Sequence, residues 1–327
     1  MTTRRKVIKA LTTAPILLPV SRVWAQDQPY PARRIEFIVG FPPGQASDTG
    51  ARFVGKAMGE ELHQTVIVIN KTGAAGIVAH QSVKHAPADG YTLLYGSTGT
   101  LAINPSLYRN LPYEPLRDFT PVVLLNASPM FLTTATATAV NSLKEFLEFV
   151  KARPGEILYG SSGNGTTQHI AMEMLKKETG LEMTHVPFKG SAPMLQDLIA
   201  GRVHFALETS TAVLPLAQGG LLKLLGVTTA TRAASNPNIA TLSEQGLPGF
   251  EAMTWAGILA PAGTPDAIVE RLNAAANRAL QTNDVLEYFA KNGSNPRGGS
   301  ASTFAQFMKA EIEKWGNAVA SSGAHID

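Results

Sequence analysis

The chain has 327 residues, of which 44% are hydrophobic and only 16% are charged. This composition excludes a disordered, highly charged protein, because so apolar a chain can bury enough surface to offset the entropy lost on folding. The length is enough for about two domains of ~150 residues each. The sequence contains no cysteine, which excludes disulfides, thiolate nucleophiles and cysteine-ligated metals.

The basic residues are concentrated at the start of the chain. Five of the 28 basic residues and none of the 25 acidic ones fall within residues 1–25, although the whole chain has a formal charge of +3. The remainder therefore has a net charge of −2, with 23 basic against 25 acidic residues. We expect no nucleic-acid partner, because a basic surface is the electrostatic requirement for one.

Residues 1–25 have the pattern of an export signal. A basic start containing Arg4 and Arg5 precedes a short apolar stretch, and small residues stand at Val23 and Ala25. The apolar stretch is about half the ~20 residues that a membrane-spanning helix needs, so cleavage after Ala25 is favoured over an anchor. The paired arginines resemble a twin-arginine signal, although ordinary secretion leaders also carry such pairs. We expect the mature protein in the periplasm.

Short apolar runs alternate with amphipathic stretches along the mature chain. The runs are rich in Val, Ile and Leu and lack strict alternation, which is typical of strands covered on both faces. Helices are expected between them, one of them opened by a capping box from Ser142 to Glu145. The sequence therefore predicts an α/β fold with two mainly parallel sheets flanked by helices. The expected strands are 35–39, 66–69, 92–95, 122–125, 157–159, 184–186, 203–207, 222–227 and 253–259.

Two extended runs, 119–130 and 250–261, have no helical period. If both cross between domains, one domain is discontinuous and the other is inserted within it. We therefore expect a first lobe made of residues 26–126 and 252–327, and a second lobe made of residues 127–251. Such a two-lobed layout has a ligand cleft between the lobes.

Four loops that follow strands are rich in Gly, Ser and Thr: 41–50, 70–76, 96–100 and 161–169. In open α/β sheets such loops gather at the carboxyl ends of the strands, where ligands bind. Glycine lets an anion approach backbone N–H groups, and a helix N-terminus adds partial positive charge. Turn formation alone would explain one such loop, but four at corresponding positions favour a ligand cleft. Ser47 or Asp48 is expected to cap the helix after the first loop.

The sequence lacks the more specific motifs of common enzyme classes. The sequence has no nucleotide P-loop, and the stretch from Gly160 to Asn164 lacks the last glycine of Gly-x-Ser-x-Gly. A hydrolase that uses Ser161 or Ser162 with His169 and an acid stays conceivable. The histidines lack metal-binding spacing, so we expect neither a metal nor a cofactor. Glu208, at a strand end, is either a solvated charge or an acceptor in the cleft.

Taken in order, short motifs along the whole mature chain resemble the solute receptors of tripartite tricarboxylate transporters, the Bug-type periplasmic binding proteins. Each motif is weak alone, and the ordered series is specific. The motifs are Phe41-Pro42-Pro43-Gly44, Asn70-Lys71-Thr72-Gly73-Ala74-Ala75-Gly76, Ala88-Asp89-Gly90-Tyr91-Thr92-Leu93, Tyr159-Gly160-Ser161-Ser162-Gly163-Asn164-Gly165, Val186-Pro187-Phe188-Lys189-Gly190, Trp255-Ala256-Gly257 and Ala260-Pro261-Ala262-Gly263-Thr264-Pro265.

The resemblance implies a two-lobed flytrap fold that binds a small carboxylate in its cleft and has a membrane transporter as partner. Gln45 stands where the family usually has Gly, and Glu208 replaces a frequent Asp. Glu208 would repel a second carboxylate but would suit an ammonium or hydroxyl group. The residues that the resemblance and the loops place in the site are Phe41, Gly44, Gln45, Ser47, Asp48, Gly73, Ala74, Ser97, Ser161, Gly165, Thr166, His169 and Glu208.

The favoured interpretation is a monomeric periplasmic receptor for a mono- or dicarboxylate that delivers it to transporter subunits. One alternative is an exported enzyme that acts on such an acid with His169 as base. Another is a receptor that reports to a membrane sensor. The sequence favours binding over catalysis, because it shows no nucleophile with an adjacent base and a third orienting group.

Overall fold

The computed structural model describes residues 30–326, so the predicted leader, its arginine pair and the cleavage after Ala25 lie outside the described residues. All nine predicted strands are present, and a two-residue strand joins them. The strands are β1 (Ile35–Val39), β2 (Val66–Asn70), β3 (Thr92–Ser97), β4 (Phe119–Ala135), β5 (Leu158–Ser161), β6 (Thr184–Pro187), β7 (Phe205–Thr209), β8 (Leu222–Val227), β9 (Met253–Pro261) and β10 (Asn295–Pro296).

The helices lie between these strands. They are α1 (Ala46–Leu62), α2 (Ile77–Lys84), α3 (Asn104–Leu107), α4 (Pro115–Asp118), α5 (Leu143–Lys151), α6 (Thr167–Thr179), α7 (Ser191–Ile199), α8 (Ser210–Gln218), α9 (Asp266–Ala279), α10 (Asn283–Lys291) and α11 (Ala301–Ser322). A short 3-10 turn, η1 (Ala74–Gly76), precedes α2, and a π turn, η2 (Gly99–Ile103), precedes α3.

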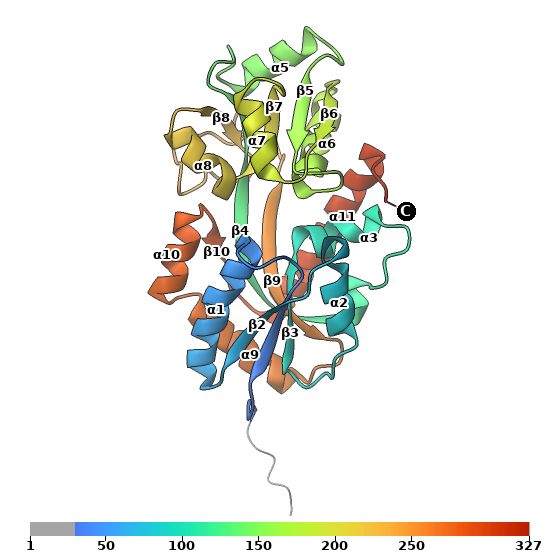
Figure 1. Ribbon diagram of the computed structural model, residues 1–327, viewed down its shortest axis with the longest axis vertical. Helices are drawn as coiled ribbons and strands as arrows, with labels where there is room; N and C mark the ends of the chain where they lie inside the picture. The colour runs from blue at the N-terminus through green and yellow to red at the C-terminus, as the bar shows by residue number, and fades with distance from the viewer. Residues whose placement is uncertain (1–29, 327) are drawn as a thin grey trace, which may run out of the picture.

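The elements form two lobes stacked along the long axis of the molecule (Figure 1). The first lobe holds β1, β2, β3, α1, α2 and α9, and the second holds β5 to β8 with α5 to α8. Strands β4 and β9 run lengthwise between them. The α/β two-lobed fold is confirmed. The predicted lobe boundaries, after residues 126 and 251, stay predictions; they fall within β4 and just before β9.

The ten strands form one continuous sheet, in the order β2-β1-β3-β9-β4-β7-β5-β6, with β8 and β10 off this path and paired to β4. The outer strands are parallel, whereas β4 and β9 run antiparallel to their neighbours. With 17 residues, β4 is about 55 Å long and pairs with β9 in one part and with β7 and β8 in the other, so it belongs to the sheet in both lobes. Its register with β9 shifts near Pro121, which has no N–H to donate to the ladder.

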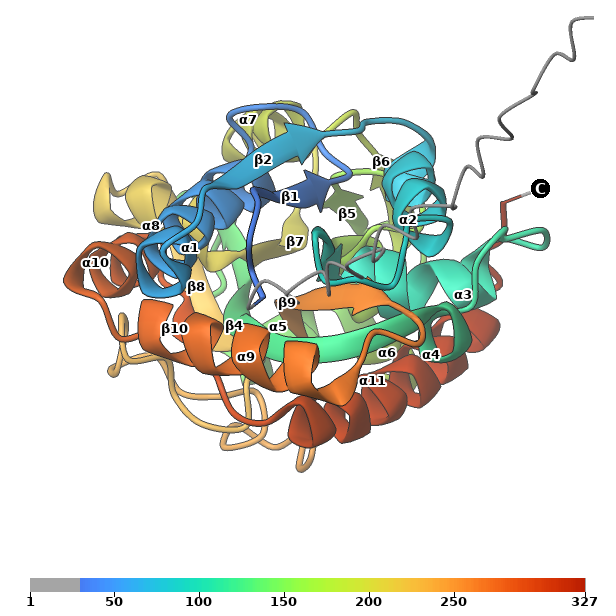
Figure 2. The same ribbon diagram turned by 90° about the horizontal axis from the view of Figure 1, so that it is seen from below.

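Helices cover the crossing strands from outside. Viewed from below, α9 and α11 run along the outer side of β4 and β9 (Figure 2). On α11, Phe304, Met308 and Trp315 are buried, which confirms that this stripe belongs to the core. Half of the predicted capping box is present, because the Ser142 side chain accepts a hydrogen bond from the Glu145 N–H. The Glu145 carboxylate accepts from the Asn141 N–H at 2.7 Å in place of the Ser142 N–H. Helix α11 packs against α6 as well as η2, so it touches both lobes.

Candidate functional site

A cavity of about 490 Å³ lies where the lobes meet. The loops after β1 and β3 and the crossing strands form one side of its wall, and the start of α6 and the end of β7 form the other. Among the described residues that line it, none is charged. The wall is made of hydroxyl, amide and aromatic side chains together with backbone. Such a wall can bind an anion through neutral donors without an ion pair.

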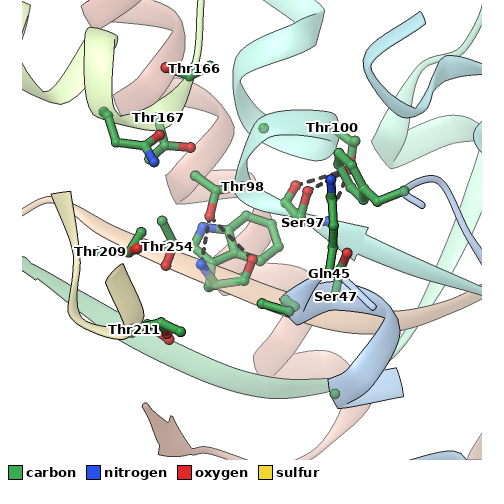
Figure 3. Close-up of a pocket in the computed structure, with 18 of the residues that line it drawn as sticks. Gln45, Ser47, Ser97, Thr98, Thr100, Thr166, Thr167, Thr209, Thr211 and Thr254 are labelled. Atoms are coloured by element: carbon green, nitrogen blue, oxygen red, sulfur yellow. Dashed lines mark hydrogen bonds between the residues drawn. The ribbon is translucent and has the colours of Figure 1, made fainter. Parts of the chain in front are cut away.

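Hydroxyl groups face the cavity from both lobes (Figure 3). Ser47 and Ser97 belong to the first lobe, while Thr166 and Thr209 belong to the second. The loop after β3 is fixed internally, because the Ser97 N–H donates to Thr100 Oγ1 over 3.0 Å. Ligand contacts from the two lobes would therefore meet in one space.

The first loop turns at Gly44, where φ is +83°, and α1 begins directly after Gln45. The expectation that Ser47 or Asp48 caps α1 is wrong, because Gln45 holds the cap position and both predicted residues lie inside the helix. This register turns Gln45 and Ser47 toward the cavity and Asp48 away from it. Phe41, at the start of the loop, also lines the cavity.

Asp48 is only 3% exposed and lies behind the loop. Its Oδ2 accepts hydrogen bonds from the Gly44 N–H at 2.8 Å and from Arg52 Nε at 3.1 Å. Its Oδ1 accepts from Asn70 Nδ2 at 2.9 Å. Burial alone would raise the pKa of Asp48, but these hydrogen bonds hold the pKa below its ordinary value. Asp48 therefore fixes the loop and does not line the cavity.

In the second loop, the cavity wall is formed by Ala75 and not by Gly73 or Ala74. Ala74 and Ala75 both have positive φ, at 44° and 50°. A left-handed alanine costs about 1–2 kcal/mol, so surrounding contacts hold this turn against its own preference.

In the second lobe, Gly165 and Thr166 line the cavity, while Ser161 and His169 lie behind them. Ser161 Oγ is 2.7 Å from Nε2 of His185, a residue on β6. His169 Nδ1 accepts a hydrogen bond from the Gly165 N–H at 3.1 Å, and its ring stacks on that of His185 at 3.9 Å. The predicted serine and histidine thus support the loop.

The two stacked histidines are neutral near pH 7. Burial lowers the pKa of His169, and burial together with the neighbouring His169 ring lowers the pKa of His185 to about 4. A neutral His169 is required here, because its Nδ1 accepts a hydrogen bond from the Gly165 N–H and must carry a free lone pair.

Glu208, at the end of β7, is fully buried. Its Oε1 accepts hydrogen bonds from Gln168 Nε2 at 2.9 Å and from the Thr209 N–H at 2.7 Å. Its Oε2 has no hydrogen-bond partner among residues 30–326. Gln168 and Thr209 line the cavity, whereas Glu208 lies directly behind them.

Sequence reasoning missed several lining residues. Thr98 and Gln168 belong to the predicted loops, and their polarity could have indicated them. Asn126, Asn292 and Ser294 gave no local signal, because they come from the middle of β4 and from the end of α10. Ser294 Oγ accepts hydrogen bonds from Asn126 Nδ2 at 2.9 Å and from Ser128 Oγ at 2.7 Å, so this part of the wall is built by tertiary contact.

Two further properties follow from the described part of the chain. Over residues 30–326 no helix is both long and apolar enough to cross a membrane. Within the same residues no group of three or more His, Asp or Glu side chains is arranged to hold a metal ion.

The sequence matches the profile of the tripartite tricarboxylate transporter family receptor over residues 51–323. Protein BugT of Bordetella pertussis is 35% identical over 317 residues, which are 97% of this chain and 96% of that protein. The structure of R. palustris Rpa4515 with adipate has a TM-score of 0.80 at 36% identity, covering 91% of this chain and all of the other. MatC (Rpa3494) from Rhodopseudomonas palustris with bound malate has a TM-score of 0.75 at 33% identity, covering 89% and 100%.

Proposed function

We propose a transport function for this chain, which belongs to the tripartite tricarboxylate transporter family of receptors. It is a receptor that binds a small organic carboxylate between its lobes and serves a tripartite tricarboxylate-type membrane transporter. The related structures with adipate and malate support a carboxylate as ligand class. The family resemblance seen in the loop motifs is thereby confirmed.

The observation that carries the ligand class is the uncharged cavity wall with hydroxyl and amide groups from both lobes. A carboxylate can accept about four hydrogen bonds, and a dry site with many neutral donors satisfies them without a cation. Of the residues predicted from sequence, six line the cavity and are our proposed contacts. They are Phe41, Gln45, Ser47, Ser97, Gly165 and Thr166.

The proposal also covers the oligomeric state, the export and the lobe boundaries of the protein. We propose that the protein acts as a monomer without catalytic activity and without a cofactor. We also propose export by a leader cleaved after Ala25, with Arg4 and Arg5 read by the twin-arginine route. With lobe boundaries near residues 126 and 251, the cavity would lie at the hinge between the lobes, so that the lobes would close around the ligand.

The test is a thermal-shift screen of the mature protein, residues 26–327, against mono-, di- and tricarboxylates. A ligand at about 100 times its dissociation constant adds about 2.7 kcal/mol of stability, which is an easily measured shift. Titration calorimetry at low and high ionic strength should then show weak salt dependence, because a buried anion bound by neutral donors is little screened. Binding of no acid, or consumption of the bound acid followed by NMR, would contradict the proposal.

A matched pair of variants tests the location. Ser47 is the second residue of α1 and lines the cavity, and Ser302 is the second residue of α11 and is exposed. An aspartate is tolerated in the first turn of a helix, so neither change should unfold the protein. Ser47→Asp should weaken carboxylate binding more than tenfold by charge repulsion, while Ser302→Asp should leave it unchanged. Equal binding by both variants would place the ligand elsewhere.

A further inference from the structure

Glu208 is a buried carboxylate without a basic neighbour. It is 0% exposed, and within residues 30–326 it forms no ion pair. Three hydrogen bonds converge on Oε1, and the third comes from Thr209 Oγ1 at 3.1 Å. Its Oε2 is buried and has no hydrogen-bond partner in the described part of the chain. Burying an uncompensated charge lowers the stability of a fold. The presence of Glu208 at this position therefore points to a functional role.

The contact with Glu208 fixes the orientation of the Gln168 side chain. A carboxylate oxygen only accepts hydrogen bonds, so the end of the Gln168 amide that faces Glu208 must be the NH₂ group. The carbonyl oxygen Oε1 is therefore the opposite end of the amide. Gln168 lines the cavity, and its Oε1 accepts no hydrogen bond from a described residue.

Thr209 is oriented by the same carboxylate. Its hydroxyl donates to Glu208 Oε1, which leaves only the lone pairs of Oγ1 for any other contact. Thr209 also lines the cavity and is the residue directly after Glu208. Two neighbouring groups of the second-lobe wall are thus both turned into hydrogen-bond acceptors.

We propose that Gln168 and Thr209 form an acceptor subsite, held in place by Glu208, for a hydrogen-bond donor on the ligand. The ligand class is a carboxylic acid that carries a hydroxyl or an ammonium group. An acid with a second carboxylate at that position would place acceptor against acceptor, near a buried acidic group, and is selected against. Gln168 is the specificity-determining residue and Glu208 the positioning residue. This inference rests on the proposed function.

The experiment compares matched acids on the mature protein by calorimetry. Succinate, malate and aspartate share one carbon chain and differ by a hydrogen, a hydroxyl and an ammonium group. Benzoate and 4-hydroxybenzoate form a second pair. We expect the substituted acid of a set to bind at least about tenfold more tightly than its parent, since two acceptors would otherwise stay unpaired. Malate and aspartate together decide between hydroxyl and ammonium.

The variant Glu208→Met keeps a side chain of similar length and removes the acceptor that orients Gln168 and Thr209. The Gln168 amide is then free to turn over and present its NH₂ group to the cavity. The preference for the substituted acid should vanish or reverse, and thermal melting checks that the variant stays folded. Gln168→Met should abolish the preference. Glu178→Met, on the exposed side of helix α6, is the matched control and should change nothing.

The outcomes separate this inference from the proposed function. Equal affinities for parent and substituted acids, or a preference that survives Glu208→Met, would overturn the acceptor subsite while leaving the carboxylate receptor intact. Failure of every acid to bind would overturn both, because the subsite has no meaning without the receptor.

Discussion

Asp48→Asn tests the view that Asp48 holds the first loop from behind. The carboxylate accepts on both oxygens: Gly44 N–H and Arg52 Nε contact Oδ2, and Asn70 Nδ2 contacts Oδ1. A second Arg52 nitrogen lies 2.9 Å from Oδ1. An asparagine has one oxygen, so one pair of donors would face an NH₂ group in place of an acceptor.

The magnitude follows from these contacts. A hydrogen bond to a charged group contributes about 1.5–3 kcal/mol, and two are lost. Arg52 is half exposed, so its share is smaller than that of the buried contacts. We expect a loss of about 2–4 kcal/mol and a melting temperature lower by about 5–10 °C. Ligand binding should weaken as well, because Gln45 and Ser47 are carried by the same turn.

The assay is thermal melting of the ligand-free protein followed by calorimetry with the best acid of the screen. Asp284→Asn is the control, since Asp284 is an exposed carboxylate whose 3.4 Å contact with Lys56 contributes at most about 1 kcal/mol. If Asp48→Asn has the melting temperature of the wild type but binds the acid poorly, Asp48 acts on the ligand directly and does not serve to hold the first loop.

Three further perturbations test the cavity and its support. Trp255 lines the cavity and Trp315 does not, so ligand binding should change the intrinsic fluorescence of the mature protein, and Trp255→Phe should abolish the change while Trp315→Phe retains it. Gly165→Ala would place a Cβ 2.2 Å from a leucine side chain on α3, so it should weaken ligand binding. Gly155 has a similar positive φ but open space around it, so Gly155→Ala should cost only about 1–2 kcal/mol of stability and leave binding unchanged. Equal binding by both variants would exclude a contact between the lobes at the Gly165 loop. The pKa of His185 is about 4 in the folded state against an ordinary 6.5, so the unfolded chain takes up the proton at a higher pH than the folded protein does. The free energy of unfolding, measured in urea, should therefore fall as the pH drops from about 6.5 to about 4. His185→Asn should make that fall smaller.

The sequence by itself determined the elements and their order. Nine short runs of branched and apolar residues became nine strands, because a strand covered on both faces has to be apolar throughout. Ser142 caps its helix as expected, since the Glu145 N–H that it accepts from lies within one turn. Gly, Ser and Thr after the strands marked the loops that supply Gln45, Ser97 and Thr166 to the cavity.

Only the tertiary structure decided which side chains of those loops face the cavity. Asp48, His169 and Glu208 stand in the predicted places, but each turns to a partner that the local sequence does not specify, such as Asn70 for Asp48. Ser294 reaches the wall because a strand of two residues pairs with β4 across more than 160 residues of chain. A helix start leaves several directions open to its first side chains, and the groups packed behind it select one of them.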